Sequence, residues 1–235
     1  MEKSNIDQIV RSIKVYLETD RMAGINELYT AVSLKPIVAA KAVPAIVCGP
    51  KPERLQELRN RTEECKGCTL FRKRTNLVFG VGDENARLMF VGEAPGQDED
   101  LKGEPFVGRA GQLLTKMIEA MGLSREKVYI ANILKCRPPN NRIPQPEEIE
   151  ACTAFLTEQI KIIEPKVICT LGKFASQFLL KSEVPISALR GKFYELNGIK
   201  VMPTYHPAYL LRNPNDKKLV WEDLKKIRDE IKTKT

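Results

Sequence analysis

Residues 88–96 read LMFVGEAPG, a short apolar run that ends in a turn bracketed by two glycines. Similar apolar runs recur along the chain with helix candidates between them. The runs lie at residues 128–131, 167–171 and 199–202, and the helix candidates at 110–121, 145–163 and 173–180. Apolar strands that alternate with helices need crossover connections. The sequence therefore predicts an α/β fold, a three-layer sandwich with a four-stranded, mostly parallel central sheet flanked by helices.

Polar residues follow the ends of these predicted strands. In strand order they are Glu93, Asn132, Lys173 and His206. Ligands of open α/β sheets bind beyond the carboxyl ends of the strands, so we expect these side chains to converge on one crevice. His206 is the only histidine in the chain. A structural role is common for a lone histidine, and a turn-forming role for an asparagine, but the strand-end positions favour function.

Composition and charge favour a polyanionic partner. The 235 residues carry 38 Lys and Arg against 30 Asp and Glu, a net charge of +8, which makes nucleic acid the first candidate. No run approaches the roughly 18 apolar residues of a membrane span, and the N-terminus lacks the apolar core of a secretory signal. We expect a cytoplasmic, nucleoid-associated protein with no membrane contact.

The sequence predicts a domain boundary near residue 50. Residues 1–50 combine one amphipathic helix, predicted at 5–18, with a linker rich in proline and alanine. This segment has no assigned function, and a protein partner is a candidate for it. Residues 51–235 form the predicted globular domain, which begins with a charged helix at 53–64.

The cysteines indicate a metal site. Cys65 and Cys68 form a C-x2-C pair, and Cys136 and Cys152 are single thiols later in the chain. Four thiolates suit either zinc or an iron–sulfur cluster, and zinc is the simpler interpretation of this spacing. Cys169 falls in an apolar run and is expected to be inert core.

Four motifs together resemble one family. They are GEAPGQDED at residues 92–100, GEPFVG at 103–108, NILKCRPP at 132–139 and HPAYLL at 206–211. Their order and content resemble those of family 4 uracil-DNA glycosylases, the iron–sulfur members of their superfamily. The resemblance covers about residues 53–230. It implies a structural [4Fe-4S] cluster held by Cys65, Cys68, Cys136 and Cys152, which decides against zinc.

The resemblance also implies an activity. The enzyme would hydrolyse the N-glycosidic bond of deoxyuridine in DNA, release uracil and leave an abasic site, which initiates base excision repair. It would act as a monomer on uracil-containing DNA without a diffusible cofactor. Because the bond is inaccessible inside a duplex, the nucleotide must be flipped into a pocket.

Site residues follow from the same resemblance. Phe106 would stack on uracil, Asn132 would bind its polar edge, and His206 would donate to O2 as charge collects on the leaving base. Glu99 would lie near C5, where the methyl group of thymine would clash. Glu93 and the Ala94 backbone would position the base or the attacking water. Family 1 enzymes carry a water-activating Asp at the position of Ala94, so Glu93 is the candidate base here.

DNA contacts are expected outside the pocket. Tyr209, Leu210, Leu211 and Arg212 resemble the loop that superfamily members press into the minor groove, and a short buried helix is the alternative. Lys173 and Arg190 are candidate phosphate contacts, and a solvated basic surface is the alternative for each. Two rival functions stay open: a DNA-binding module without catalysis, and a glycosylase for another deaminated base such as hypoxanthine.

Overall fold

The computed structural model describes residues 49–233. The helix predicted at residues 5–18 and almost all of the linker that follows it lie outside the described residues. The first described helix is α2 (Lys51–Glu63), which confirms the charged helix predicted at residues 53–64. Pro50 precedes its first turn, where a missing N–H is not needed by the helix.

The central sheet has six strands, two more than predicted. They are β1 (Val81–Gly82), β2 (Leu88–Gly92), β3 (Tyr129–Asn132), β4 (Val167–Leu171), β5 (Tyr194–Leu196) and β6 (Ile199–Thr204). Their order is β1-β3-β2-β4-β6-β5. The four predicted runs form a parallel centre, and the short strands β1 and β5 add an antiparallel edge on each side. The sheet therefore has six strands instead of four, and it combines parallel and antiparallel pairs.

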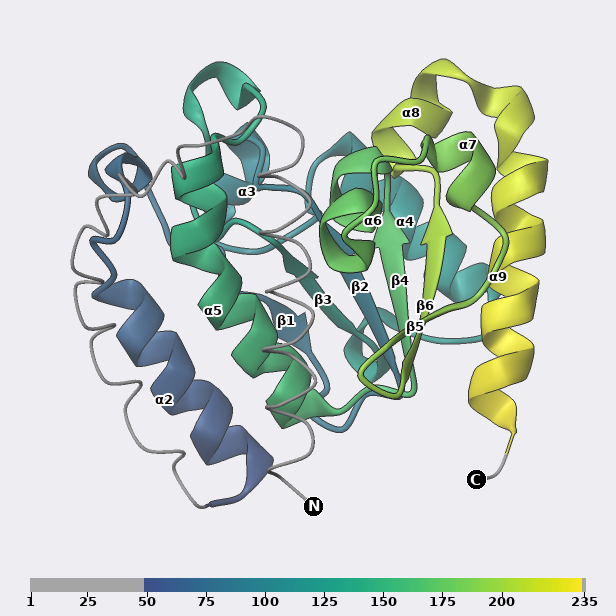
Figure 1. Ribbon diagram of the computed structural model, residues 1–235, viewed down its shortest axis with the longest axis horizontal. Coiled ribbons are helices and arrows are strands. Elements are labelled where there is room, and N and C mark those ends of the chain that lie inside the picture. Colours follow the sequence, from purple (N-terminus) through teal and green to yellow (C-terminus); the bar gives the residue numbers. More distant parts are fainter. Residues whose placement is uncertain (1–48, 234–235) are drawn as a thin grey trace, which may run out of the picture. The chain divides into compact units, whose positions relative to one another are not determined.

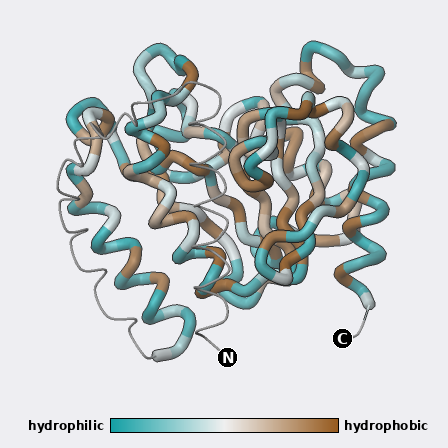
Figure 2. The backbone as a smooth tube through the Cα atoms, viewed as in Figure 1, coloured by the Kyte–Doolittle hydropathy of each residue, from teal (hydrophilic) through white to brown (hydrophobic). Residues whose placement is uncertain are grey.

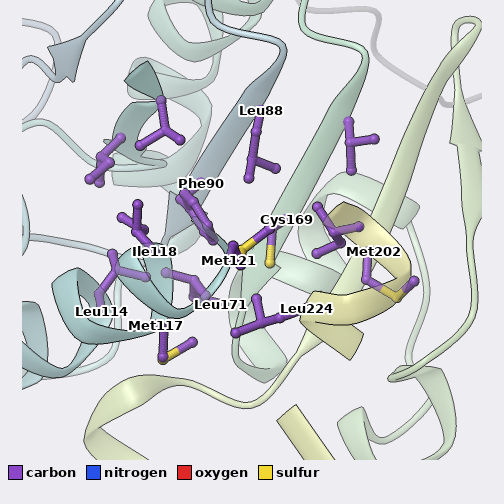
Figure 3. Packing of buried hydrophobic residues seen from close by; sticks show 14 of the residues in the cluster. Leu88, Phe90, Leu114, Met117, Ile118, Met121, Cys169, Leu171, Met202 and Leu224 are labelled. Atoms are coloured by element: carbon purple, nitrogen blue, oxygen red, sulfur yellow. The ribbon is translucent and has the colours of Figure 1, made fainter. Parts of the chain in front are cut away.

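Alternate side chains of the buried strands enter two different cores. On one face, Phe90 and Cys169 pack with α4 (Arg109–Ala120), α8 (Pro207–Arg212) and α9 (Lys217–Lys232). Figure 3 shows this packing, in which Met117 and Ile118 of α4 and Leu224 of α9 meet strand residues. Burial on both faces explains why β2 and β4 are apolar without alternation.

The other face of the sheet is covered by α5 (Pro146–Ile163) and α6 (Lys173–Leu180). Leu156 of α5 and Ala175 of α6 pack there with Met89 and Val91 of β2. Figure 1 shows α2 beside α5, and Leu58 and Ile162 join these two helices in a smaller core. Helices therefore lie on both faces of the sheet, as a three-layer sandwich requires. Figure 2 shows brown, apolar backbone in the central strands, whereas teal alternates with brown along the outer helices.

Several short elements complete the described chain. They are α3 (Gln97–Lys102), α7 (Ile186–Leu189) and the 3-10 turns Thr69–Arg72, Arg125–Lys127, Pro139–Asn141 and Pro214–Asp216. Within residues 49–233, the helices are all too short or too polar to cross a lipid bilayer.

Candidate active site

The carboxyl ends of β2, β3 and β6 open into one cavity of about 530 Å³. This volume falls in the range of sites for small ligands. The structure brings to it all six residues that were predicted to contact a base. They are Glu93, Ala94, Glu99, Phe106, Asn132 and His206. Parallel strands explain the convergence, because their carboxyl ends meet at one edge of the sheet.

Asn132 ends β3 and is 2% exposed. Its neighbour in β2 is Gly92, where a Cβ atom would lie 2.4 Å from Asn132 Oδ1 and 2.6 Å from the ring of Phe106. Glycine at this position therefore makes room for both side chains. Asn132 Oδ1 is buried and has no hydrogen-bond partner among the described residues. An orphan of this kind costs about 1–3 kcal/mol, and a ligand that donates a hydrogen bond would remove the cost.

His206 follows β6 and caps the N-terminus of α8. Its Nδ1 accepts a hydrogen bond from the backbone N–H of Ala208 (3.0 Å). The neutral ring therefore carries its proton on Nε2. Burial, together with the nearby Arg212 cation and against the opposing charge of Glu99, lowers the pKa of His206 to about 4. At neutral pH the side chain is thus an uncharged donor at Nε2.

Phe106 supplies an aromatic wall of the cavity. It is 6% exposed, and its ring centroid lies 5.6 Å from that of His206 at an interplanar angle of 34°. Its backbone φ is 55°, in the left-handed region that residues with a side chain rarely occupy. A fixed aromatic ring beside a polar amide and an imidazole can bind a flat heterocycle.

Two carboxylates line the same cavity in different ways. Burial raises the pKa of Glu93, which follows β2 directly. Glu99 of α3 accepts hydrogen bonds from the backbone N–H groups of Gly96, Val107 and Gly108. Glu93 is therefore more basic than an exposed glutamate, and the carboxylate of Glu99 is bound to the loops around it.

Two supports of the cavity were not predicted. Arg142 lies on the lining, and its guanidinium donates to both oxygens of Glu148 (2.5 and 2.9 Å), which is 1% exposed. The ammonium of Lys135, also 1% exposed, donates to the carbonyl oxygen of Asn132 (2.8 Å) and to Gln159 Oε1 (2.6 Å). The sequence did carry a signal for Lys135, because a lysine is unusual inside the apolar stretch that follows β3. No local signal marked Arg142.

The four predicted metal ligands come from three segments that pack together. Cys136 and Cys152 are buried in one core cluster, and Cys68 packs against it. Cys65 Sγ faces α5 across Gly67, where a Cβ would lie 3.6 Å from the sulfur and 3.4 Å from the Ala151 side chain. Arg74 donates a hydrogen bond to Cys136 Sγ (3.4 Å). Cys169 lies apart from them, buried in β4, as predicted.

Comparisons with known proteins identify the family. A model described as the uracil DNA glycosylase superfamily matches residues 79–225. The type-4 uracil-DNA glycosylase of Archaeoglobus fulgidus is 49% identical over 183 residues, which cover 74% of this chain and 92% of the relative. The chain belongs to the type-4 branch of the uracil-DNA glycosylase superfamily. Type-4 enzymes of Saccharolobus solfataricus (46% identical, 77% of this chain, 88% of the relative) and Thermotoga maritima (47%, 77%, 97%) agree with this assignment.

In this type-4 chain, the predicted DNA-contact segment is the helix α8, and its four residues differ in exposure. Leu211 is 39% exposed and Arg212 is exposed at the cavity. Tyr209 is half-buried, and its hydroxyl donates to Asp216 (2.7 Å). Leu210 is 1% exposed and belongs to the core. The prediction that Leu210 contacts DNA is corrected: helical spacing turns it inward and leaves Leu211 as the exposed apolar side chain.

The two predicted phosphate contacts also separate. Lys173 is exposed at the start of α6. The residue before it, Gly172, lies beside His206. The side chain of Arg190 is only 15% exposed, and its guanidinium binds Asp223 through two hydrogen bonds (2.5 and 3.1 Å). Arg190 is therefore a structural ion-pair partner, and its predicted role in DNA binding is not supported.

Proposed function

We propose that this chain is a uracil-DNA glycosylase that hydrolyses the N-glycosidic bond of deoxyuridine in DNA. The observation that carries the proposal is the orphaned carbonyl oxygen of Asn132, which shares one cavity with Phe106 and His206. Uracil has an N–H between two carbonyl groups. Its N3–H supplies the missing donor for Asn132, and its O2 accepts from His206 Nε2.

Base selection follows from the same donor and acceptor pattern. Cytosine presents an unprotonated N3, which would leave the carbonyl oxygen of Asn132 buried and unpaired. Phe106 stacks on the base and limits its tilt. Thymine differs from uracil by a methyl group on C5, and that methyl meets the wall that contains Glu99.

His206 stabilises the leaving base. When the bond between C1′ and N1 breaks, its electron pair stays with uracil and negative charge spreads to O2. The donor at Nε2 is held by the bond between Nδ1 and the Ala208 N–H, so it is oriented before the charge develops. A donor of this kind contributes on the order of 3 kcal/mol to the transition state.

Glu93 is the candidate for the attacking water. The water oxygen bonds to C1′, and its proton passes to the carboxylate. The raised pKa of Glu93 makes the carboxylate a better base than an exposed glutamate. This role is supported by the position of Glu93 at the end of β2 on the cavity lining.

DNA binding is proposed for the exposed cations around the cavity and for Leu211. Flipping a nucleotide leaves a gap in the base stack, which an exposed apolar side chain beside the pocket can fill. Leu211 has that exposure, and Arg212 and Lys173 offer charge to the phosphates. Action as a monomer and a location at the nucleoid stay predictions.

Cys65, Cys68, Cys136 and Cys152 are proposed to hold a structural [4Fe-4S] cluster. The donor set fits, because the four side chains are all thiols and lie where three segments pack. Within residues 49–233, no three potential ligands lie close enough to bind a single metal ion. A four-iron cluster takes each thiolate on a different iron and so needs donors that are further apart. The cluster would join the three segments and take no part in hydrolysis.

The test is base excision from a defined substrate. Protein purified without oxygen is incubated with a labelled oligonucleotide that contains one uracil, followed by alkali, beside a thymine control. Strand cleavage at uracil alone supports the proposal. Intact DNA with protein that holds its iron would instead favour the DNA-binding module, and cleavage of a hypoxanthine substrate only would favour the glycosylase for another base.

A further inference from the structure

Glu99 uses both of its carboxylate oxygens inside the protein. Oε2 accepts a hydrogen bond from the N–H of Gly96 (3.1 Å), which precedes α3. Oε1 accepts from the N–H groups of Val107 (2.9 Å) and Gly108 (3.0 Å), the two residues that follow Phe106. One side chain therefore ties the turn after β2 to the segment that carries the aromatic wall.

Phe106 needs such support because of its backbone. A φ of 55° costs free energy for a residue with a side chain and persists only where the surroundings enforce it. Before it, Arg125 donates to the carbonyl oxygen of Pro105 (2.5 Å). After it, the bonds to Glu99 are charge-assisted, a class roughly twice as strong as bonds between neutral groups.

We infer that Glu99 is a positioning residue for Phe106: its carboxylate fixes residues 106–108 and so sets the ring on which the base stacks. This inference rests on the proposed function, since uracil is the base that the ring would hold. It changes the interpretation of Glu99 as a steric gate. The methyl group of thymine meets a wall that Glu99 holds in place, and the carboxylate itself is turned toward the backbone.

The two interpretations differ for a variant of similar bulk. Glu99→Leu fills the same space but accepts no hydrogen bond. A gate would still exclude thymine and still admit uracil, so excision would stay at the wild-type level. If Glu99 is a positioning residue, the leucine variant loses the hydrogen bonds that hold Phe106. Single-turnover excision of uracil is then expected to fall about 100-fold, the cost of a misplacement near 1 Å. Free uracil should also inhibit less strongly, while binding to DNA with a non-hydrolysable abasic analogue persists.

Glu99→Gln provides the second variant if the leucine variant does not fold. Whichever way its amide turns, at least one backbone N–H faces a donor, so excision is expected to fall about tenfold, between wild type and Glu99→Leu. Glu104→Gln is the matched control. Glu104 lies on the same segment but is bound at the surface to Lys102 (3.3 Å), and its variant should excise uracil at the wild-type rate.

A double-mutant cycle with Phe106→Leu decides whether Glu99 acts through the ring. If it does, adding Glu99→Gln to Phe106→Leu changes excision by less than about twofold, because the side chain to be positioned is absent. Additive losses, or wild-type excision by either Glu99 variant, would each overturn the inference. Absence of uracil excision by the wild-type chain would instead reject the proposed function itself.

Discussion

His206 enters the proposed reaction with its protonation state already set by the fold. The N–H of Ala208 occupies Nδ1, and burial lowers the pKa of the imidazole to about 4. A neutral ring has one proton to donate, and here only Nε2 can carry it. Burial therefore removes the positive charge, and the hydrogen bond from Ala208 selects the nitrogen that faces the leaving base in our mechanism.

The single histidine makes this state measurable. Because the untagged chain contains no other imidazole, ¹⁵N NMR should show one ring that titrates near pH 4, with the proton on Nε2 above that pH. In the unfolded chain the imidazole of His206 protonates near pH 6.5. Between pH 4 and 6.5 the unfolded state therefore binds more protons at this residue than the folded state does. The stability that His206 contributes is then present above pH 6.5 and is lost as the pH falls toward 4. A midpoint near 6.5, or a proton on Nδ1, would contradict the assignment.

Asn132 should separate function from stability. Its buried carbonyl oxygen has no partner, so Asn132→Ala removes a polar group that the folded protein does not satisfy. We expect the free energy of unfolding to change by less than about 1 kcal/mol, because the lost packing and the lost penalty oppose each other. Uracil excision should fall at least about tenfold. Denaturant unfolding and single-turnover kinetics on the same variant check both parts, and a large stability loss would mean that Asn132 is mainly structural.

At the scale of elements, two basic residues that look alike in the sequence have opposite roles. Arg190 binds Asp223, which is fully buried in α9 and also accepts from the Thr204 hydroxyl at the end of β6 (2.6 Å). This network joins α9 to the strand that leads to His206. Lys173 has an exposed side chain at the start of α6.

Matched substitutions should reveal this difference. Arg190→Met leaves the Asp223 carboxylate buried without its cation, and we expect a loss of about 3–5 kcal/mol in unfolding free energy. Lys173→Met should leave stability within about 0.5 kcal/mol but weaken DNA binding and reduce the slope of log affinity against log salt by about one. Unfolding curves and salt titrations of DNA binding test the pair. The assignment fails if Arg190→Met changes the salt slope at unchanged stability.

The sequence predicted the elements and side chains that have a local signal, and it missed those that depend on distant contacts. Strands β2 and β4 and helix α6 were predicted correctly, because a buried apolar run and a helical stretch with clear ends are local signals in the sequence. Strands β1 and β5 were missed because two or three partly exposed residues form only against a neighbour. Helix α9 was missed although Val220, Leu224, Ile227 and Ile231 have helical spacing. The strand-end side chains were found, but the partners of Glu99 and Arg190 arise from contacts between distant segments.

At the scale of the whole described chain, the thiols and the cavity share a segment. Residues 132–136 begin with Asn132 at the cavity and end with Cys136 among the thiols. Between them, Lys135 is buried and bonded both to the Asn132 carbonyl and to Gln159 of α5. A change at the thiols therefore has a short, rigid connection to the residue that recognises the base in our mechanism.

Removing one thiol should show whether these four cysteines hold a cluster. Cys152→Ser is expected to lower the iron and sulfide content, the visible absorbance and the melting temperature together, because cluster binding contributes to folding free energy. The control is Cys169→Ala, which alters a thiol that is equally buried but lies in β4 away from the other four. It should keep its iron and lose only the stability of a small cavity, about 1 kcal/mol. If Cys152→Ser keeps a full complement of iron, or if Cys169→Ala loses it, the four proposed ligands are wrong.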